Sequence, residues 1–250
     1  MTEIIQKSRD DIEIMRQAGR IVAHTLAMVE ANVRPGITTG ELNDMVDTFI
    51  RERNAIPAFK DYQGYPASAC ISIDEEVVHG IPGKRALQEG QIVSVDVGAI
   101  YDGFYGDAAA TFAVGKVSAE KARLMDVTRS CLQAGIDKVR TGNKLGQISA
   151  AVQGLAEREG FSVVRQLVGH GIGRKMHEEP QVPNYGFPDD GPVLETGVVL
   201  AIEPMINMGA YEVKTMPDGW TFVTVDGLPS AHFEHTVAVT DDGPDILTLL

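Results

Sequence analysis

A weak internal repeat constrains the fold of this sequence more than any other feature. The segment Val33-Arg34-Pro35-Gly36 precedes a helical pattern and recurs 106 residues later as Val139-Arg140-Thr141-Gly142, again before a helical pattern. Further on, residues 87–96 match residues 194–203 at an offset of 107, so that an aspartate aligns with a glutamate. Any one match could arise by chance, but their shared order indicates a duplicated half-unit with helices, two strands and a carboxylate.

Both halves are predicted to begin with two helices. Ser8 can cap the first helix of one half and Ser118 that of the other, each before apolar residues at helical spacing. Residues 38–41, Thr-Thr-Gly-Glu, have the pattern of a capping box. Strand-like runs follow, with a hairpin turn at Asp102-Gly103. This order predicts an α+β fold in which helices cover one face of a mainly antiparallel sheet.

The chain of 250 residues is expected to form one domain, with internal halves of roughly 1–115 and 116–250. No linker rich in Pro, Gly or Ser separates the halves. Two cysteines cannot staple a fold of this size, which indicates a reducing compartment. The sequence has neither a signal-peptide pattern nor an apolar run of about 18 residues. We therefore expect a cytoplasmic protein without membrane association.

The net charge limits the classes of partner. With 22 basic and 35 acidic residues, the formal charge is −13. Such a surplus repels phosphate backbones, so DNA binding through a broad basic surface is not expected. Neutral or cationic partners, metal ions included, are favoured.

The predicted hairpin places two acids on one face of a sheet. A two-residue turn at Asp102-Gly103 sets Gly98 opposite Asp107. Asp96 then lies on the same face as Asp107 and diagonal to it, with Cα atoms about 7–8 Å apart. Carboxylates buried among apolar residues cost free energy unless they are paired or bound to metal. From the hairpin alone, an acid exposed to water at the turn or the sheet edge is an equal alternative.

The second half adds acids and a histidine of the same kind. Glu203 ends one strand-like apolar run and Glu234 opens another, which gives four carboxylates at strand positions. His170 lies between two glycines, which allow the backbone to approach a ligand closely. Three or four carboxylates with one or two histidines suit a pair of divalent cations about 3.5–4 Å apart. His79 and His177 are then candidates for contacting substrate, and metal-assisted hydrolysis of an amide is the predicted reaction.

Four segments resemble type I methionine aminopeptidases, and the resemblance extends over essentially the whole chain: VSVDVGAIYDGFYGDAAATF, GHGIGRKMHEEPQVPNY, LAIEP and EHTVAV. It implies the pita-bread fold, a single catalytic domain whose two αβ halves are related by a pseudo-two-fold axis around a curved, mainly antiparallel sheet. It also implies removal of the initiator methionine from deformylated nascent polypeptides when the second residue is small and uncharged. The absence of the inserted segment of type II enzymes places the chain with the short bacterial-style group.

The resemblance implies a role for each candidate metal ligand. Asp96 would hold one metal ion, while His170 and Glu203 would complete the site of a second. Asp107 and Glu234 would bridge the two ions. Glu203 would also orient or deprotonate the attacking water.

The remaining site residues would contact substrate. By resemblance, His79 would meet the substrate near its N-terminus and the scissile amide, and His177 would stabilise the carbonyl oxygen as it becomes tetrahedral. The methionine pocket would be lined by Phe59, Tyr62, Tyr65, Cys70, Met176 and Trp220. Phe59 and Met176 stand where more variable residues are expected, so the depth of the pocket depends on them. A thioether gains contact with such soft and aromatic groups.

Two divalent ions per chain are expected, and the ligand set is compatible with Co, Mn, Fe or Zn. The resemblance further implies a monovalent cation near the carbonyls of Asp74, Glu76 and Ser230. The sequence begins Met1-Thr2, which fits the small-residue rule for a self-substrate.

Partners other than the nascent chain are expected to be few. Bacterial relatives approach the ribosome through a basic loop, but residues 205–233 contain Lys214 as their single Lys or Arg. We therefore expect this loop to support only weak or transient ribosome contact. We also expect a monomer.

Two alternatives remain open on the sequence. A prolidase or aminopeptidase P relative would share the metal ligands, although those enzymes typically carry an extra N-terminal domain, for which the first helix near Ser8 leaves no space. A pseudoenzyme of the same fold would serve as a binding module. Because such proteins lose ligands and all five are present here, catalysis is favoured.

Overall fold

The computed structural model describes residues 3–250, so the expected processing at Met1-Thr2 lies outside the described residues. The helices are α1 (Arg9–Asn32), α2 (Thr39–Arg51), α3 (Ala119–Ile136) and α4 (Gly146–Arg158), with a short 3₁₀ helix at Tyr62–Gly64. None of the helices in this described part is both long and apolar enough to cross a bilayer.

The strands of the first half are β1 (Ile56–Pro57), β2 (Cys70–Ile73), β3 (Glu76–Val78), β4 (Ile92–Tyr101) and β5 (Phe104–Ala113). Those of the second half are β6 (Ser162–Val163), β7 (Gly169–Gly171), β8 (Glu178–Val182), β9 (Val199–Ile202), β10 (Met205–Asn207), β11 (Val213–Thr215), β12 (Phe222–Thr224), β13 (Ser230–His232), β14 (His235–Thr240) and β15 (Gly243–Ile246).

The predicted helix starts are confirmed. The Ser8 side chain accepts a hydrogen bond from the backbone of Asp11, and the Ser118 side chain accepts one from Lys121. Thr38 and Glu41 form the expected reciprocal capping box at the start of α2. These caps satisfy backbone N–H groups that the first helical turn leaves without partners.

The hairpin register is also as predicted. β4 and β5 pair through a tight turn that sets Tyr101 opposite Phe104 and Gly98 opposite Asp107. β2 and β1 complete this sheet on the other edge of β4. Helix α1 packs on β5 and β4, and α2 packs beside α1. The first core lies between these layers and includes Val22, Val46, Ile71 and Val95.

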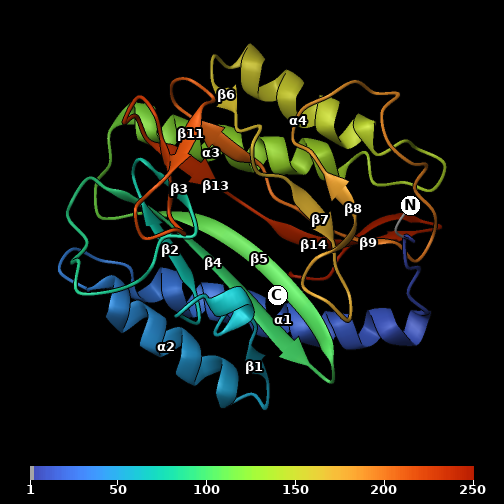
Figure 1. Cartoon of the computed structure of the whole chain (residues 1–250), viewed down its shortest axis with the longest axis horizontal. Helices are drawn as coiled ribbons and strands as arrows, with labels where there is room; N and C mark the ends of the chain where they lie inside the picture. The colour runs from blue at the N-terminus through green and yellow to red at the C-terminus, as the bar shows by residue number, and fades with distance from the viewer. Residues whose placement is uncertain (1–2) are drawn as a thin grey trace.

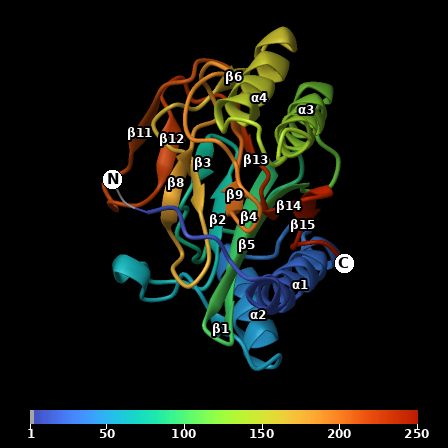
Figure 2. The ribbon, with the colours of Figure 1, turned by 90° about the vertical axis from the view of Figure 1, so that its right-hand side faces the viewer.

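The second half repeats this plan. Strands β15-β14-β9-β7-β8 form a five-stranded sheet, and α3 and α4 pack together beside it. Every strand pairing within residues 3–250 is antiparallel. The pair α1–α2 and the pair α3–α4 flank the strands (Figure 1), and a second view shows α1 and α3 on one side of β4 and β5, with β8 and β12 on the other (Figure 2). The predicted α+β pita-bread architecture is confirmed.

Hydrogen bonds join the two halves along one seam, which we define as the contact of β5 with residues 232–236. The Thr236 hydroxyl donates to the Asp107 carbonyl at 2.7 Å and accepts from the Asp107 N–H at 3.1 Å. The N–H of Glu234 donates to the Ala109 carbonyl at 2.9 Å. The seam therefore fixes the backbone of two predicted ligands, one from each half, against one another.

Two local features differ from the sequence-based expectation. Glu203 and Glu234 lie one residue outside β9 and β14 instead of inside strands. Residues 205–233 are not a loop, since they contain β10 to β13. Their acids serve as turn acceptors: Asp218 accepts from the backbones of Trp220 and Thr221, and Asp226 from those of Ala210 and Leu228.

Candidate metal centre

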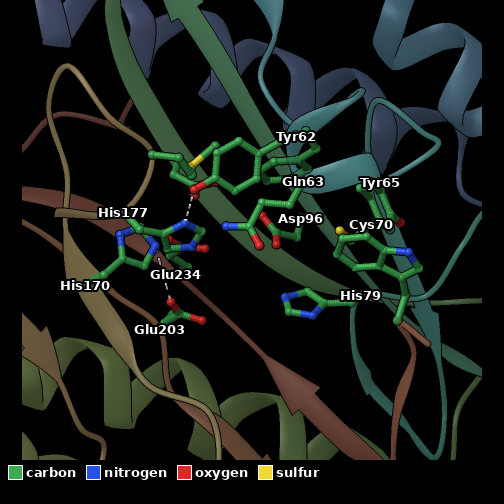
Figure 3. Close-up of a pocket in the computed structure, with 14 residues that line it drawn as sticks. Tyr62, Gln63, Tyr65, Cys70, His79, Asp96, His170, His177, Glu203 and Glu234 are labelled. Atoms are coloured by element: carbon green, nitrogen blue, oxygen red, sulfur yellow. Dashed lines mark hydrogen bonds and ion pairs between the residues drawn. The ribbon is translucent and has the colours of Figure 1, made fainter. Parts of the chain in front are cut away.

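One cavity of about 140 Å³ gathers the candidate residues from both halves (Figure 3). It is smaller than the roughly 300–1,000 Å³ of pockets for drug-sized ligands, and so has the scale of a single side chain. Its lining consists of Phe59, Tyr62, Gln63, Tyr65, Cys70, His79, Asp96, Asp107, His170, Met176, His177, Glu203, Trp220 and Glu234. Every candidate ligand and substrate-contacting residue from the sequence is therefore in this lining.

The acids meet at the floor of the cavity. Asp107, His170 and Glu234 each offer one ligand atom, and these three atoms lie within 4.8 Å of one another. Asp96 projects from β4 beside them, and Glu203 approaches from the end of β9. The buried oxygens Asp96 Oδ1, Asp107 Oδ1 and Glu234 Oε1 have no hydrogen-bond partner. Orphaned anionic oxygens around one point are the donor set that a divalent cation satisfies.

The backbone fixes the ring of His170 for ligation. His170 Nδ1 lies 2.9 Å from the Gly171 carbonyl, which can only accept, so the ring hydrogen sits on Nδ1. The lone pair on Nε2 is then free and lies 3.7 Å from Glu203 Oε1. Burial lowers the pKa of His170 to about 3, with a further contribution from the nearby His177. At neutral pH this imidazole is therefore neutral, as a metal ligand must be.

Burial has the opposite effect on the acids. Burial raises the pKa of Asp107 to about 7. The pKa values of Asp96, Glu203 and Glu234 are also raised well above their usual range, first by burial and then by the charge of Asp107 and of one another. Ionisation of four clustered, buried carboxyl groups is unfavourable unless a positive charge lies close to them. A bound dication would supply that charge and stabilise the carboxylates.

His79 stands on the other side of the cavity from His170 and His177 (Figure 3). Its backbone has φ of 60°, in the left-handed region that costs free energy for a residue with a side chain. The Tyr65 hydroxyl donates to the adjacent Gly80 carbonyl at 2.8 Å, and the His79 ring packs edge-on to Phe222. Burial lowers the pKa of His79 to about 4. The strained backbone thus holds a neutral imidazole over the cavity.

His177 is oriented by an aromatic partner. Its Nδ1 forms a 2.7 Å hydrogen bond with the Tyr62 hydroxyl, and its ring lies edge-on to that of His170. Burial lowers the pKa of His177. When the phenol donates to Nδ1, the ring hydrogen is on Nε2, which leaves that nitrogen as a donor.

The remaining wall is apolar and tightly packed. Tyr65 and Trp220 meet edge to face at 5.2 Å. Phe59, Cys70 and Met176 are buried around them. Phe59 and Met176 both approach Gly98 of β4, where a Cβ would lie 2.8 Å from Phe59 and 3.1 Å from Met176. The glycine therefore makes room for the side chains that line the pocket.

The residues expected around a monovalent cation are partly engaged elsewhere. The Asp74 carbonyl accepts a hydrogen bond from the Ser230 N–H at 2.9 Å, so these two residues are adjacent. The Glu76 carboxylate pairs with Arg85 at 2.9 Å and accepts from the Ile73 N–H. The monovalent cation itself stays a prediction.

Sequence reasoning missed two residues at the site. Gln63 lines the cavity from a turn in which Gln63 itself has φ of 50°. His232 lies behind the cavity wall, 1% exposed at its side chain, with Nε2 at 3.7 Å from Glu203 Oε2. The signal for His232 was its place two residues before Glu234, because alternate residues of an extended segment share a face.

Comparison with known proteins agrees with this geometry. A family model described as metallopeptidase family M24 matches residues 13–241. A methionine aminopeptidase of Clostridium acetobutylicum is 55% identical over 98% of this chain and 99% of its own. The chain belongs to the methionine aminopeptidases of family M24. The crystal structure of the methionine aminopeptidase from Thermotoga maritima superimposes with a TM-score of 0.97 at 46% identity and covers all of both chains.

A more distant M24 fold clarifies the prolidase alternative. The prolidase from Pyrococcus furiosus has a TM-score of 0.81 at 21% identity, and the match covers 99% of this chain but 66% of that one. That likeness shows a shared fold alone. The high-identity methionine aminopeptidase relatives therefore favour a methionine aminopeptidase over a prolidase. Membership of M24 implies a divalent metal.

Proposed function

We propose that this chain removes the N-terminal initiator methionine of nascent, deformylated polypeptides whose second residue is small and uncharged. The observation that carries the proposal is the cavity itself. A cluster of unpaired acids and one imidazole forms its floor, and an apolar wall sized for one side chain stands beside that floor. We assign the metal ligands as Asp96, Asp107, His170, Glu203 and Glu234.

The ligand set would hold two divalent ions, of Co, Mn, Fe or Zn, and Asp107 and Glu234 would be among the residues that hold them. Such ions, when bound, polarise a carbonyl and lower the pKa of a water from about 15.7 towards ~7. Glu203 takes the proton of the attacking water. Its burial, which raises the pKa of its carboxyl group, favours that acceptance. The proton can then pass to the leaving amine.

The two histidines outside the ligand set contact the substrate. His177, oriented by Tyr62, donates from Nε2 to the carbonyl oxygen as that oxygen gains charge. His79, neutral and fixed on its strained backbone, faces the scissile amide and the free amine. Protonation of either imidazole would add a positive charge beside a site built for cations, so both act in the neutral form.

The apolar wall selects the first residue of the substrate. Tyr65, Trp220, Cys70, Phe59 and Met176 offer aromatic and thioether contacts to a methionine side chain. The cavity volume of about 140 Å³ leaves little room beyond that side chain. A small second residue is then needed for the scissile bond to reach the acids.

Peptide hydrolysis after metal removal tests the proposal. We expect cleavage of Met-Ala-Ser but not of an X-Pro peptide, loss of activity on chelation, and recovery when Mn²⁺ or Co²⁺ is restored. Leu-Ala-Ser is the matched control for the pocket, and Met-Phe-Ser for the second position. Turnover that survives complete metal removal, or faster cleavage of the X-Pro peptide, would refute it.

We further infer that the protein acts in the cytoplasm as a monomer and meets the ribosome weakly. The support for weak ribosome contact is the low basic content of residues 205–233, in which Lys214 on β11 is exposed. In co-sedimentation at physiological salt, we expect most of the protein to remain unbound. Strong binding that the Lys214→Ala variant abolishes would contradict this inference.

A further inference from the structure

His232 is a buried histidine that the proposed mechanism does not use. Its side chain is 1% exposed, and it is not part of the cavity lining. Its Nε2 is buried without a hydrogen-bond partner. A polar nitrogen left unpaired in the interior costs free energy, so its retention calls for an explanation.

The backbone of His232 is held firmly by the first half of the chain. The Thr111 hydroxyl donates to the His232 carbonyl at 2.8 Å and accepts from the His232 N–H at 3.0 Å. Thr111 is itself within 2.8 Å of the Ser94 hydroxyl across the β4–β5 pair. These hydrogen bonds therefore fix the backbone position from which the His232 imidazole projects.

The neighbours of the unpaired nitrogen are acids of the metal centre. Nε2 lies 3.7 Å from Glu203 Oε2 and 4.0 Å from Glu234 Oε2. The other Glu203 oxygen, Oε1, lies 3.7 Å from His170 Nε2. Glu203 thus stands between two imidazoles, one facing each of its oxygens. A shift of about 0.5 Å would bring His232 Nε2 within hydrogen-bond distance of Oε2.

An ionised carboxylate accepts hydrogen bonds and cannot donate them. Nε2 must therefore carry the ring hydrogen of His232 if it is to pair with Glu203. His170 is in the opposite state, because its hydrogen is on Nδ1 and its Nε2 is a free lone pair. The two rings are complementary: one is suited to bind an ion, and the other to donate to the carboxylate.

We propose that His232 is a positioning residue that acts through Glu203: its Nε2–H binds Oε2 and fixes the rotation of the carboxylate that ligates metal and receives the water proton. This inference rests on the function proposed above. It adds a residue that touches neither the substrate nor the ions. Partners of this kind orient ligands, and their loss typically costs about 10–100-fold in metal affinity or activity.

Two amide substitutions at His232 distinguish the role of Nε2 from that of Nδ1. In His232→Gln the amide nitrogen can occupy the place of Nε2, whereas in His232→Asn it reaches only the place of Nδ1. We expect His232→Asn to lower kcat on Met-Ala-Ser by about 10–100-fold with KM within about twofold. We expect His232→Gln to restore kcat to within about threefold of the unsubstituted protein.

Calorimetric titration of the metal-free proteins with Mn²⁺ gives a readout that does not depend on turnover. We expect His232→Asn to bind Mn²⁺ about tenfold more weakly and His232→Gln to bind it nearly as well as the unsubstituted protein. His235→Gln is the control, because His235 is also a largely buried histidine but its Nδ1 lies 2.8 Å from the Thr248 hydroxyl, away from the cavity. This control should lower the unfolding temperature without changing Mn²⁺ affinity.

Either of two results would overturn the positioning role. One is a His232→Asn variant that matches the unsubstituted protein in both kcat and Mn²⁺ affinity. The other is a His232→Gln variant as impaired as His232→Asn, since the imidazole itself, and not its donor, would then be required. Unfolding curves of both amide variants establish that the comparison is between folded proteins. An unsubstituted protein with no activity on methionine peptides would refute the proposed function, while the Mn²⁺ titrations would still rank the two variants.

Discussion

At the scale of single residues, the Glu203 side chain must meet two functional requirements that conflict. It must lie among other acids to hold metal, and it must remain basic enough to take a proton from water. Burial and the charge of Asp107 raise the pKa of its carboxyl group, which costs stability and favours proton acceptance. At this position, the property that favours catalysis therefore lowers the stability of the folded protein.

The substitution Glu203→Gln separates those demands. We expect kcat to fall at least 100-fold, because the amide cannot accept the proton. We also expect the metal-free variant to unfold at the same or a higher temperature, since one ionisable carboxyl group is removed from a buried cluster of four. Peptide hydrolysis and thermal unfolding measure the two effects. Retention of more than about a tenth of the activity would show that another group is the base.

At Tyr62, the effect of the hydroxyl group can be measured separately from that of the aromatic ring. Tyr62→Phe keeps the aromatic wall but removes the hydroxyl that lies 2.7 Å from His177 Nδ1. We expect kcat to fall by about tenfold, consistent with the loss of one hydrogen bond of ~1–1.5 kcal/mol that orients the ring. KM should change less than kcat. Steady-state kinetics on Met-Ala-Ser test this, and an unchanged kcat would mean that His177 is held by packing alone.

The sequence predicted single residues well where a strand register determined them. Asp96 and Asp107 were placed together by the two-residue turn, and the structure has that register. Gln63 could not be placed, because it depends on positive φ values at Asp61 and Gln63 that no apolar periodicity encodes. His232 was missed because its contact with Glu203 joins two strands far apart in the sequence.

At the scale of elements, the β4–β5 hairpin has a close approach of other residues on each of its two faces. Asp96 enters the cavity, and Gly98 lets Phe59 and Met176 close over the same face. On neighbouring β5, a Cβ at Gly106 would lie 2.7 Å from the backbone of Gly19, so α1 rests directly on the strand. One face of the hairpin thus leaves room for the pocket residues, and the other face leaves room for helix α1.

Gly98→Ala tests the pocket side of this arrangement. The added methyl must displace Phe59, Met176 or the fixed Ala58 Cβ at 2.9 Å, so we expect KM for Met-Ala-Ser to rise about tenfold through overpacking of ~1.4 kcal/mol. Gly106→Ala is the matched control on the paired strand. It should reduce thermal stability, through its clash with α1, and leave KM unchanged. Equal effects of both variants on KM would contradict the assignment of Phe59 and Met176 to the pocket.

The sequence predicted long elements and missed short ones. Helices α1, α2 and α3 begin with side-chain caps, α4 was indicated by the repeat, and all four helices are present. By resemblance to bacterial relatives, residues 205–233 are expected to be a loop, but they contain strands that are each three residues long and are separated by Gly, Pro and Asp. Such strands gain their stability from neighbours, among them β3 and β6, that lie far away in the sequence.

At the scale of the whole molecule, the metal centre makes stability depend on pH. In the metal-free protein, burial raises the pKa of Asp107 to about 7, and the pKa values of Asp96, Glu203 and Glu234 are also raised well above their usual range. A raised folded-state pKa contributes stability at low pH that is lost as pH rises through that value. The buried histidines, with lowered pKa values, work in the opposite direction, but only below about pH 6.5.

We therefore expect the metal-free protein to lose stability between about pH 6.5 and 8, where only the acids still titrate in the folded state. Mn²⁺ should remove this loss by binding the ionised acids. Thermal unfolding at a series of pH values, with and without Mn²⁺, measures both. Asp107→Asn should flatten the metal-free curve, whereas a metal-free protein that gains stability over this range would contradict the burial of four coupled acids.

The seam between the halves has a consequence for the origin of the protein. The first half contributes Asp96 and Asp107, and the second contributes His170, Glu203 and Glu234, so a dication in this centre would be shared across the pseudo-two-fold axis. A single ancestral half-unit would present only two of the acids and an open edge. It could have enclosed an ion only by pairing with an identical copy, as a symmetric homodimer.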